Sequence, residues 1–356
     1  MKTLLPANLK MRLQRLYRYE FWPFWLFYIP LYFYGLWLGL RARSFTYFTA
    51  TNPDMPWGGV MGISKSAVLR QFDPELLPVT LTVEPQIAEP DLLARLNVAG
   101  LNFPLVAKPD VGERGKSVEK INDLPELQTY LAAAPATIIL QEFIDLPLEL
   151  GILYYRLPGE TQGRISSVVV RDFLRVTGDG RQTLAELAGA QLRGMHRLDY
   201  FARKFGTAWH KVVPANHCIL LEPIGNHNRG TAFLSGNHLI TPQLERVFDE
   251  ITRPVQGFYY GRFDLKAGSY AELYEGRNIK LLELNGVASE PAHVYDPGMR
   301  LLAAYRDIFS HARTIWQIAR ANHRRGVAYA PLADFLKALR LHLKTSGKEK
   351  RVASVQ

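Results

Sequence analysis

Two stretches of sequence decide the fold: Gly261-Arg-Phe-Asp-Leu-Lys266 and Ile279-Lys-Leu-Leu-Glu-Leu-Asn285. Both predict short β-strands, joined by a polar loop. Glu283 and Asn285 are two positions apart and therefore share one face of the second strand. If the two strands pair, Asp264 of the first strand can join them.

Two carboxylates and an amide oxygen from neighbouring strands form a hard-oxygen cluster that suits Mg²⁺ bound to phosphate oxygens. Arg262, on the same face as Asp264, could hold an anion beside the metal. The alternative is a salt-bridge network with Arg262 and Lys280, because buried carboxylates are costly to leave unpaired. The sequence leaves both interpretations open at this point.

A second motif combines a strand with a glycine-containing turn. Phe103-Pro-Leu-Val-Ala-Lys-Pro-Asp110 predicts a strand that delivers Lys108 at its end, and Val111-Gly-Glu-Arg-Gly-Lys-Ser-Val118 follows at once. Such a lysine and loop can neutralise and cover nucleotide phosphates. A solvated hairpin with surface charges is the alternative. Neither the glycine spacing of a P-loop nor a G-x-G-x-x-G is present.

The middle of the chain, residues 62–311, alternates short β-rich runs with helical stretches and has no regular βαβ period. Ile138–Asp145 reads as a buried strand that runs into acidic residues, and Leu148–Tyr155 reads as the next strand. This pattern predicts the α+β class.

Taken in order, these elements resemble the ATP-grasp superfamily, and in particular its carboxylate–amine ligases, over about residues 62–300. Lys65, in Ile63–Arg70, resembles the first ATP-binding lysine of that family, and Lys108 resembles the second. The mobile loop that covers the phosphates would then lie at 112–117, with Gly112, Gly115, Lys116 and Ser117.

The resemblance also assigns roles to the other motifs. The adenine-binding hinge would comprise Gln141, Glu142, Phe143 and Ile144; Glu149 would hold the ribose; Asp264, Glu283 and Asn285 would be the metal ligands; Arg262 would be the transition-state arginine. Arg175, in Arg175–Leu184, and Arg229, in Gly225–Gly230, match segments of peptide-forming members, so they and Arg171 would bind the γ-phosphate or a substrate carboxylate.

The implied fold is two α+β lobes that clasp ATP, and the implied chemistry is ATP- and Mg²⁺-dependent amide-bond formation through an acyl phosphate. The substrates would be small-molecule or lipid carboxylates and amines, and members of the family are often homodimers. An ATP-grasp kinase with a hydroxyl acceptor and a non-catalytic, membrane-tethered ATP-binding module remain alternatives. The chain departs from the family because residues 44–61 leave no space for the usual preceding α/β domain.

Composition sets further limits. The chain has 356 residues, a single cysteine (Cys218) and a net charge of +10. One cysteine excludes a disulfide framework and fits a reducing compartment. Residues 1–70 carry nine Lys or Arg against two acids and 312–356 carry ten against two, whereas the middle is acidic overall. Basic ends around an apolar segment favour an anionic membrane surface over nucleic acid as the partner.

That apolar segment is 21–40, FWPFWLFYIPLYFYGLWLGL, with ten aromatic residues and no charge. Twenty helical residues would cover roughly 30 Å, enough to cross a bilayer. Cations on both sides of it argue against a simple span if ATP must reach residues 44 onward. We therefore expect monotopic attachment at the cytoplasmic face of a membrane. Burial against the domain or in a dimer interface is the alternative.

The segment 331–345 also combines apolar and basic residues: its apolar residues recur at helical spacing, opposite lysine and arginine. It predicts a membrane-surface helix or an ordinary amphipathic helix packed on the domain. The predicted organisation is an N-terminal basic and aromatic segment (1–45), a turn-rich connector (46–61), a first lobe (62–148), a second lobe with the metal site (149–311), and a basic amphipathic helix and tail (312–356).

Overall fold

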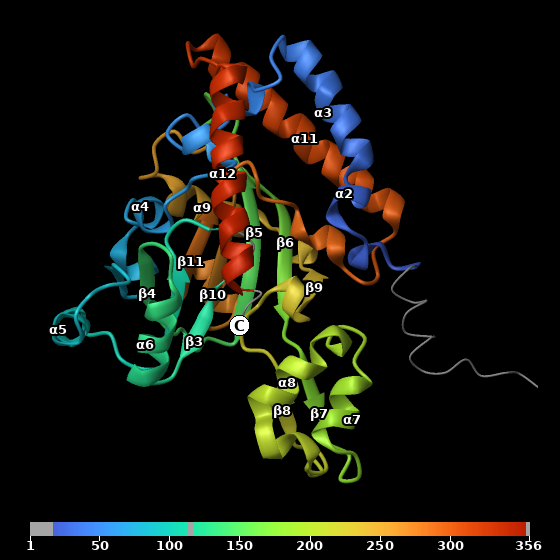
Figure 1. Cartoon of the computed structure of the whole chain (residues 1–356). Coiled ribbons are helices and arrows are strands. Elements are labelled where there is room, and N and C mark those ends of the chain that lie inside the picture. The colour runs from blue at the N-terminus through green and yellow to red at the C-terminus, as the bar shows by residue number, and fades with distance from the viewer. Residues whose placement is uncertain (1–16, 113–116, 354–356) are drawn as a thin grey trace, which may run out of the picture.

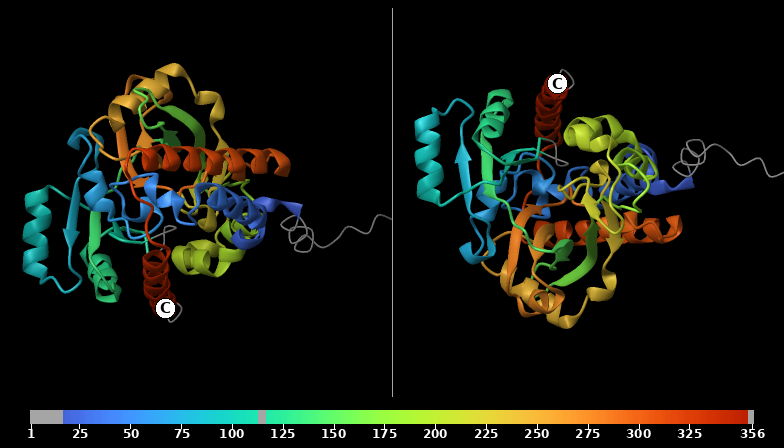
Figure 2. Two further views of the ribbon diagram at one scale, coloured as in Figure 1. Left: turned by 90° about the horizontal axis from the view of Figure 1, so that it is seen from above. Right: turned by 90° about the horizontal axis from the view of Figure 1, so that it is seen from below.

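The computed structural model describes residues 17–112 and 117–353 and contains three antiparallel β-sheets with helices packed around them (Figure 1). Two of the sheets are large and lie in separate lobes, and the third is a two-stranded insert. The arrangement confirms the α+β class that the sequence predicts. Figure 2 shows the two lobes side by side, with the insert next to them.

The first lobe contains a four-stranded sheet in the order β1-β4-β2-β3. Helices α5 and α6 cover it with leucines four residues apart, which places them on one face of each helix. The α6 helix starts cleanly because the Asp123 side chain accepts the backbone N–H of Glu126 at 2.9 Å. The elements of this lobe are β1 (Thr80–Val83), α5 (Glu89–Ala99), β2 (Leu105–Pro109), β3 (Glu119–Ile121), α6 (Leu124–Ala133) and β4 (Ile138–Glu142).

The second lobe contains a five-stranded sheet in the order β11-β10-β5-β6-β9. Its strands are β5 (Leu148–Tyr155), β6 (Arg164–Asp172), β9 (Ala232–Ser235), β10 (Tyr260–Ala267) and β11 (Ile279–Asn285). One face is apolar: Phe263 and Leu265 of β10 pack with Ile152 of β5 into the largest core cluster. The helices that cover this face are α4 (Lys65–Leu69), α9 (Pro242–Thr252) and α10 (Tyr270–Glu275).

Because side chains alternate along a strand, the opposite face of this sheet carries Arg262, Asp264 and Lys266 of β10. Glu149 of β5 and Arg171 of β6 contact these side chains and so line the same face. Four of these five charged side chains are at most 12% exposed. Charged side chains are rarely buried to this extent unless they are paired, so this face of the sheet is a candidate functional site.

An insert between β6 and β9 has its own small core, built around Leu174, Phe201 and Trp209. It is the yellow-green unit at the bottom of Figure 1. The predicted second lobe, 149–311, therefore includes a separate folding element that the sequence did not reveal. Its elements are β7 (Arg175–Thr177), α7 (Leu184–Gly189), α8 (Leu198–Phe205) and β8 (Cys218–Leu220).

The aromatic segment forms helices α2 (Phe24–Phe27) and α3 (Ile29–Ala42), and α3 lies along the long helix α11 (Leu301–Arg324), as Figures 1 and 2 show. Trp316 of α11 donates its Nε1–H to the Leu38 carbonyl at 3.0 Å, and Phe309 packs edge-on against Tyr34. Within the described residues, no helix has both the length and the apolar composition needed to cross a bilayer.

The last helix, α12 (Leu332–Ala353), stands at the edge of the molecule, in front of the lobes in Figure 1 and seen end-on in Figure 2. Near its start, Phe335 packs edge-on against Phe48 and Trp57 of the connector. Farther along, Leu336 and Leu343 are exposed. The amphipathic helix expected over 331–345 is therefore present, but much of its apolar side does not pack on the domain.

The turn-rich connector 46–61, whose role the sequence left open, holds the edge of the second lobe. Asn52 is fully buried and donates its amide N–H groups to Gly58 O at 3.0 Å and Tyr260 O at 2.8 Å. Its Oδ1 accepts the backbone N–H groups of Tyr259 and Tyr260. The connector in turn accepts hydrogen bonds from Val287 and Ala288, so it positions the loop that follows Asn285.

Replacement of Asn52 by alanine should lower the free energy of unfolding by about 3 kcal/mol or more, because several buried backbone groups would lose their partner. Urea denaturation followed by circular dichroism measures this change. The matched control is Asn102→Ala, since Asn102 is exposed and bonds only within its own turn, to Gly100 O. Equal stability of the two variants would contradict the proposed role of Asn52.

Candidate functional site

The predicted metal-ligand residues lie on the charged face of the five-stranded sheet. Strands β10 and β11 pair antiparallel, with Asp264 directly opposite Glu283 and Arg262 opposite Asn285. The expectation that these two strands pair is confirmed. A register shift follows Asp264, between Asp264 and Leu265, at the point where the acidic pair meets.

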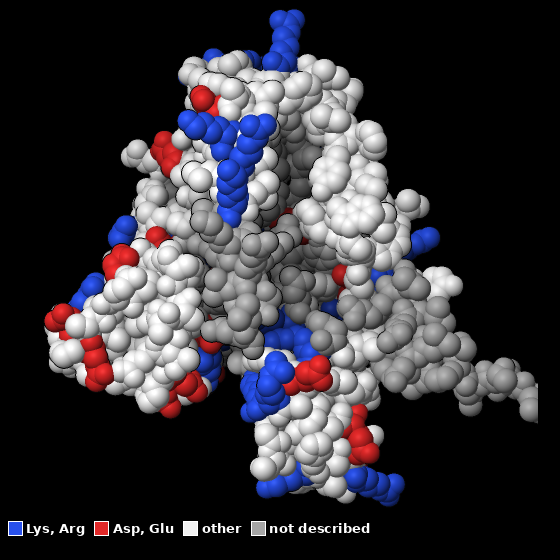
Figure 3. Space-filling view, viewed as in Figure 1, with Lys and Arg blue, Asp and Glu red and all other residues white. Residues whose placement is uncertain are grey.

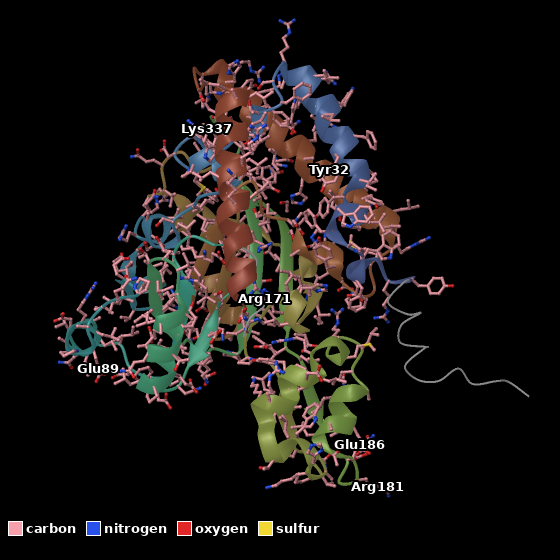
Figure 4. The ribbon with its side chains drawn as sticks, viewed as in Figure 1. Tyr32, Glu89, Arg171, Arg181, Glu186 and Lys337 are labelled. Carbon is pink, nitrogen blue, oxygen red and sulfur yellow. The ribbon has the colours of Figure 1, made fainter. Side chains whose placement is uncertain are left out.

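Arg171 bridges two buried carboxylates at the centre of this face. Its Nη1 lies 2.7 Å from Glu149 Oε1, and its Nη2 lies 2.8 Å from Asp264 Oδ2. Arg262 adds a second contact to Asp264, from Nε to Oδ1 at 2.8 Å. The charged row therefore reads Glu149, Arg171, Asp264, Arg262, with alternating sign. Figure 4 labels Arg171 near the lower end of the five-stranded sheet, above the insert.

This network sets the protonation state of Asp264. Burial alone would raise the pKa of its carboxyl group, but the charges of Arg171 and Arg262 outweigh burial and hold the pKa below its ordinary value. Asp264 is therefore an anion at neutral pH. Part of the salt-bridge alternative is also present, but Lys280 is not in the network: it donates instead to Glu75 O and Leu77 O.

Two glycines make room for the network. A Cβ atom on Gly225 would lie 2.2 Å from Glu149 Oε1 and 2.9 Å from the Arg171 side chain. The Gly225 carbonyl also accepts from Arg171 Nη1 at 2.7 Å. On β5, a Cβ on Gly151 would lie 3.2 Å from Asp264 Oδ1. At Gly225, the backbone of the segment 225–230 therefore approaches Glu149 and Arg171 closely, and a side chain at this position would block that approach.

Lys108 extends from the first lobe to the second. Its Nζ donates to Gln141 Oε1 at 2.9 Å on the neighbouring strand, and to Leu282 O at 3.1 Å on β11. Burial lowers the pKa of Lys108 to about 8, an effect that Glu283 partly offsets. A buried cation beside β11 is placed to meet an anion that enters between the lobes.

Lys65 begins α4 and faces the same space. Its Nζ donates to Gly112 O at 2.7 Å and lies 4.0 Å from Glu283 Oε1. The start of α4 is tied to the end of β2, because Asp110 accepts from Ser64 Oγ and from the Ser66 backbone N–H. The two lysines that the resemblance assigned to ATP are therefore brought to one place.

The predicted phosphate loop, 112–117, is only partly within the described residues. Gly115 and Lys116 lie outside them, so their predicted role is untested. Gly112 contacts Lys65, as above. Ser117 has a left-handed backbone (φ 53°), and its carbonyl accepts from the Tyr130 hydroxyl at 2.5 Å.

The predicted hinge joins the two lobes, since β4 ends at Glu142 and β5 begins at Leu148. Ile144 O accepts from Lys266 Nζ at 2.8 Å, and the Lys120 ammonium lies 4.1 Å from the centre of the Phe143 ring. The Gln141 side chain accepts the hydrogen bond from Lys108. Glu149 is paired with Arg171, and its Oε2 lies 3.7 Å from Lys266; its ribose-binding role stays a prediction.

The two remaining predicted arginines, Arg229 and Arg175, have different surroundings. Arg229 is next to buried Glu222 at 3.7 Å, and Arg197 binds the other oxygen of that carboxylate. Arg175 is exposed on β7 of the insert, and the structure does not bring it into the Arg171 network of the described residues.

The donor set fits a hard divalent cation. Within 17–112 and 117–353, no three His, Cys, Asp or Glu side chains are grouped to hold a metal. The predicted set instead uses two carboxylates, Asp264 and Glu283, and the Asn285 amide. Glu283 is 29% exposed, and its ion pair within the described part of the chain is a long one to Lys65, so it can accept a new partner. An ionised carboxylate accepts about four hydrogen bonds, so Asp264 can keep its arginines and still bind a cation.

Sequence reasoning missed a further buried carboxylate, Glu20. Glu20, just before the aromatic helices, is ion-paired with Arg193 of the insert region, and its backbone carbonyl accepts from His227 Nε2 at 3.0 Å. The Phe21 ring stacks on the His227 ring at 6.3 Å. The aromatic segment is therefore fixed to the 225–230 segment. The signal available in the sequence was a lone acid among the basic residues of the first 50 positions.

No family model and no curated protein matches the sequence. Among solved structures, a bifunctional glutathione synthetase from Pasteurella multocida is 14% identical, with a TM-score of 0.35, over 72% of this chain and 38% of that chain. A D-alanine–D-alanine ligase from Bacillus anthracis is 12% identical (TM-score 0.36, 73% of this chain and 67% of that chain). The same ligase complexed with ATP is 13% identical (TM-score 0.37, 73% and 66%). Similarity at this level establishes neither fold nor function.

Replacement of Arg171 by methionine should lower the free energy of unfolding by about 3 kcal/mol or more, because Glu149 and Asp264 would stay buried with part of their neutralising charge removed. Chemical denaturation at pH 7 measures this change.

The control is Arg277→Met, which breaks an exposed ion pair with Glu275 and should change stability little. If both variants lose the same stability, Arg171 does not have the central role described here.

Proposed function

We propose that this chain is an ATP-dependent carboxylate–amine ligase of the ATP-grasp type, which forms an amide bond through an acyl phosphate. One observation carries the proposal: buried Lys108 of one antiparallel sheet reaches β11 of the other, beside Asp264 and Glu283. A cationic group from one lobe therefore lies beside an oxygen donor set from the other, which is the combination of groups that binding of a polyphosphate and a divalent cation requires.

In the first step, an oxygen of the substrate carboxylate attacks the γ-phosphorus of ATP. The bond from that phosphorus to the β,γ-bridging oxygen breaks, and ADP leaves. Lys65 and Lys108 offset the phosphate charge at this stage. Asp264, Glu283 and Asn285 would hold Mg²⁺, which supplies charge neutralisation at the phosphate oxygens when bound.

In the second step, an amine attacks the acyl carbon, which now carries phosphate as a competent leaving group. Arg262 stabilises the negative charge that develops on the carbonyl oxygen. The C–O bond to phosphate then breaks, inorganic phosphate leaves, and the nitrogen loses a proton to solvent. Closure of the 112–117 loop would exclude water and protect the acyl phosphate from hydrolysis.

We also propose that one substrate is a lipid or is carried by one, and that the enzyme works at the cytoplasmic face of a membrane, where ATP is available. The support is the contact between the aromatic segment and the site: Glu20 and Phe21 bind His227, two residues after Gly225, which contacts Arg171. Full activity on a water-soluble acid without lipid or detergent would count against this proposal.

Hydroxylamine trapping tests the ligase chemistry. Purified protein with ATP, Mg²⁺, hydroxylamine and a bacterial extract of lipids and metabolites should yield a hydroxamate, detected by mass spectrometry, because hydroxylamine intercepts an acyl phosphate. ADP with a stable phosphorylated alcohol and no hydroxamate would show that the protein is a kinase instead.

Two variants serve as controls for this trapping. Asp264→Ala and Glu283→Gln should both abolish the hydroxamate, and the second does so without leaving Arg171 and Arg262 unpaired. ATP binding that does not depend on Mg²⁺, with no turnover in any extract, would favour a non-catalytic module.

The low pKa of Lys108 predicts proton uptake on ATP binding. Near pH 8.5 most Lys108 is neutral, since its pKa is about 8, and phosphate charge would restore the proton. Affinity should fall as the pH rises above 8 because charging Lys108 then costs free energy. Calorimetry in buffers of different ionisation enthalpy should show uptake approaching one proton at pH 8.5 and little at pH 7.

Lys108→Arg is the matched variant, because arginine stays protonated throughout this range. It should bind ATP without proton uptake at pH 8.5. The same uptake in wild type and variant would assign the titrating group elsewhere.

A further inference from the structure

Helices α2 and α3 present an apolar face to solvent. The side toward α11 is buried, as at Leu38, whereas the outer side is exposed over three turns. We call this outer side the aromatic face. Its six main residues are Trp25 (62% exposed), Tyr32 (51%), Phe33 (69%), Leu36 (53%), Trp37 (46%) and Leu40 (67%).

Scattered exposed apolar residues are ordinary, but a continuous set of this size marks a binding surface. Five of the six positions lie on α3, where 32, 33, 36, 37 and 40 fall on one side of the helix, and Trp25 on α2 extends this surface. No charged residue interrupts 21–40. Figure 3 shows the same region as an uninterrupted white surface at the upper right.

Cations stand at both ends of the aromatic face. Arg18 precedes it, and Arg41 and Arg43 follow it, all exposed. The Arg41 guanidinium lies 5.0 Å from the Trp37 ring centre, so it shields part of that ring while its charge stays near water. Aromatic side chains with flanking arginines match the boundary between lipid headgroups and acyl chains.

A second helix adds cations at the same end of the molecule. On α12, Lys337, Arg340 and Lys344 are exposed beside exposed Leu336. Figure 3 shows this basic group on the same side as the aromatic face, across a groove. Figure 4 labels Tyr32 and Lys337 at this end, and Arg181 and Glu186 of the insert at the opposite end.

We propose that the aromatic face is a docking surface for an anionic lipid bilayer, with α2 and α3 lying in the plane of the interface. A crossing orientation does not fit, because α3 has 14 residues, about 21 Å at 1.5 Å per residue, and one side of it is packed on α11. This inference concerns attachment and holds whether or not the ligase chemistry is confirmed.

Vesicle sedimentation with the full chain tests the proposal. Wild-type protein should sediment with phosphatidylcholine–phosphatidylglycerol vesicles and more weakly with phosphatidylcholine alone. Salt at 0.5 M should weaken the binding without abolishing it, since screening removes the charge contribution only. Because Trp25 and Trp37 are exposed, binding should also shift the tryptophan emission to shorter wavelength.

The variant Phe33→Ser/Leu40→Ser should lower the partition coefficient on the order of tenfold or more, since two inserted side chains are lost. The matched control, Val98→Ser/Val212→Ser, removes two exposed apolar side chains from α5 and from the insert and should bind as wild type does. Circular dichroism and thermal unfolding establish that both variants fold.

Two results would overturn the proposal. One is failure of the wild-type chain to bind anionic vesicles, or equal binding by the variant and the control. The other is a stable dimer in light scattering that Phe33→Ser/Leu40→Ser converts to a monomer, with no vesicle binding, which would identify the aromatic face as an interface between two copies of this chain.

Discussion

The rest of the site depends on the position of Arg171 between Glu149 and Asp264. The three side chains come from β6, β5 and β10, so one guanidinium ties three neighbouring strands across the charged face of the sheet. Two buried carboxylates this close would otherwise repel one another and take up protons. With Arg171 in place, Asp264 remains an anion, and an anionic Asp264 is what a cation site on β10 and β11 requires.

A second constraint acts between the lobes. Lys108 is a buried cation on the four-stranded sheet, and its hydrogen bonds go to Gln141 of its own sheet and to Leu282 O of the other. Neither partner is a carboxylate, and burial therefore lowers its pKa. The hydrogen bond from Lys108 to β11 connects the two lobes. The positive charge of Lys108 has no carboxylate as its hydrogen-bond partner, so it favours binding of an anion. The same residue thus contributes to the fold and to the proposed binding of phosphate.

The sequence predicted the parts of this site that depend on local patterns. Residues two apart on β11 share a face, and the polar loop before them predicts pairing with β10, so Asp264 and Glu283 could be placed together. Long-range partners could not be predicted. Arg171 meets Asp264 across 93 residues, and Asn52 meets Tyr260 across 208, so no spacing rule connects them. The insert around Phe201 was missed for the same reason, because its small core is assembled from both ends of the segment 174–221.

For the aromatic segment, composition and structure answer different questions. Composition indicates an apolar surface, but only the position of α11 decides which side of α3 is buried and which remains exposed. Glu20 lies just before the aromatic helices, next to the insert. Its carboxylate is buried and neutralises the charge of Arg193, which explains an acidic residue among the basic residues of this region. Its carbonyl accepts from His227, and His227 follows Gly225, which packs against Arg171. A chain of direct contacts therefore connects the residues that precede the aromatic face with the backbone beside the charged network.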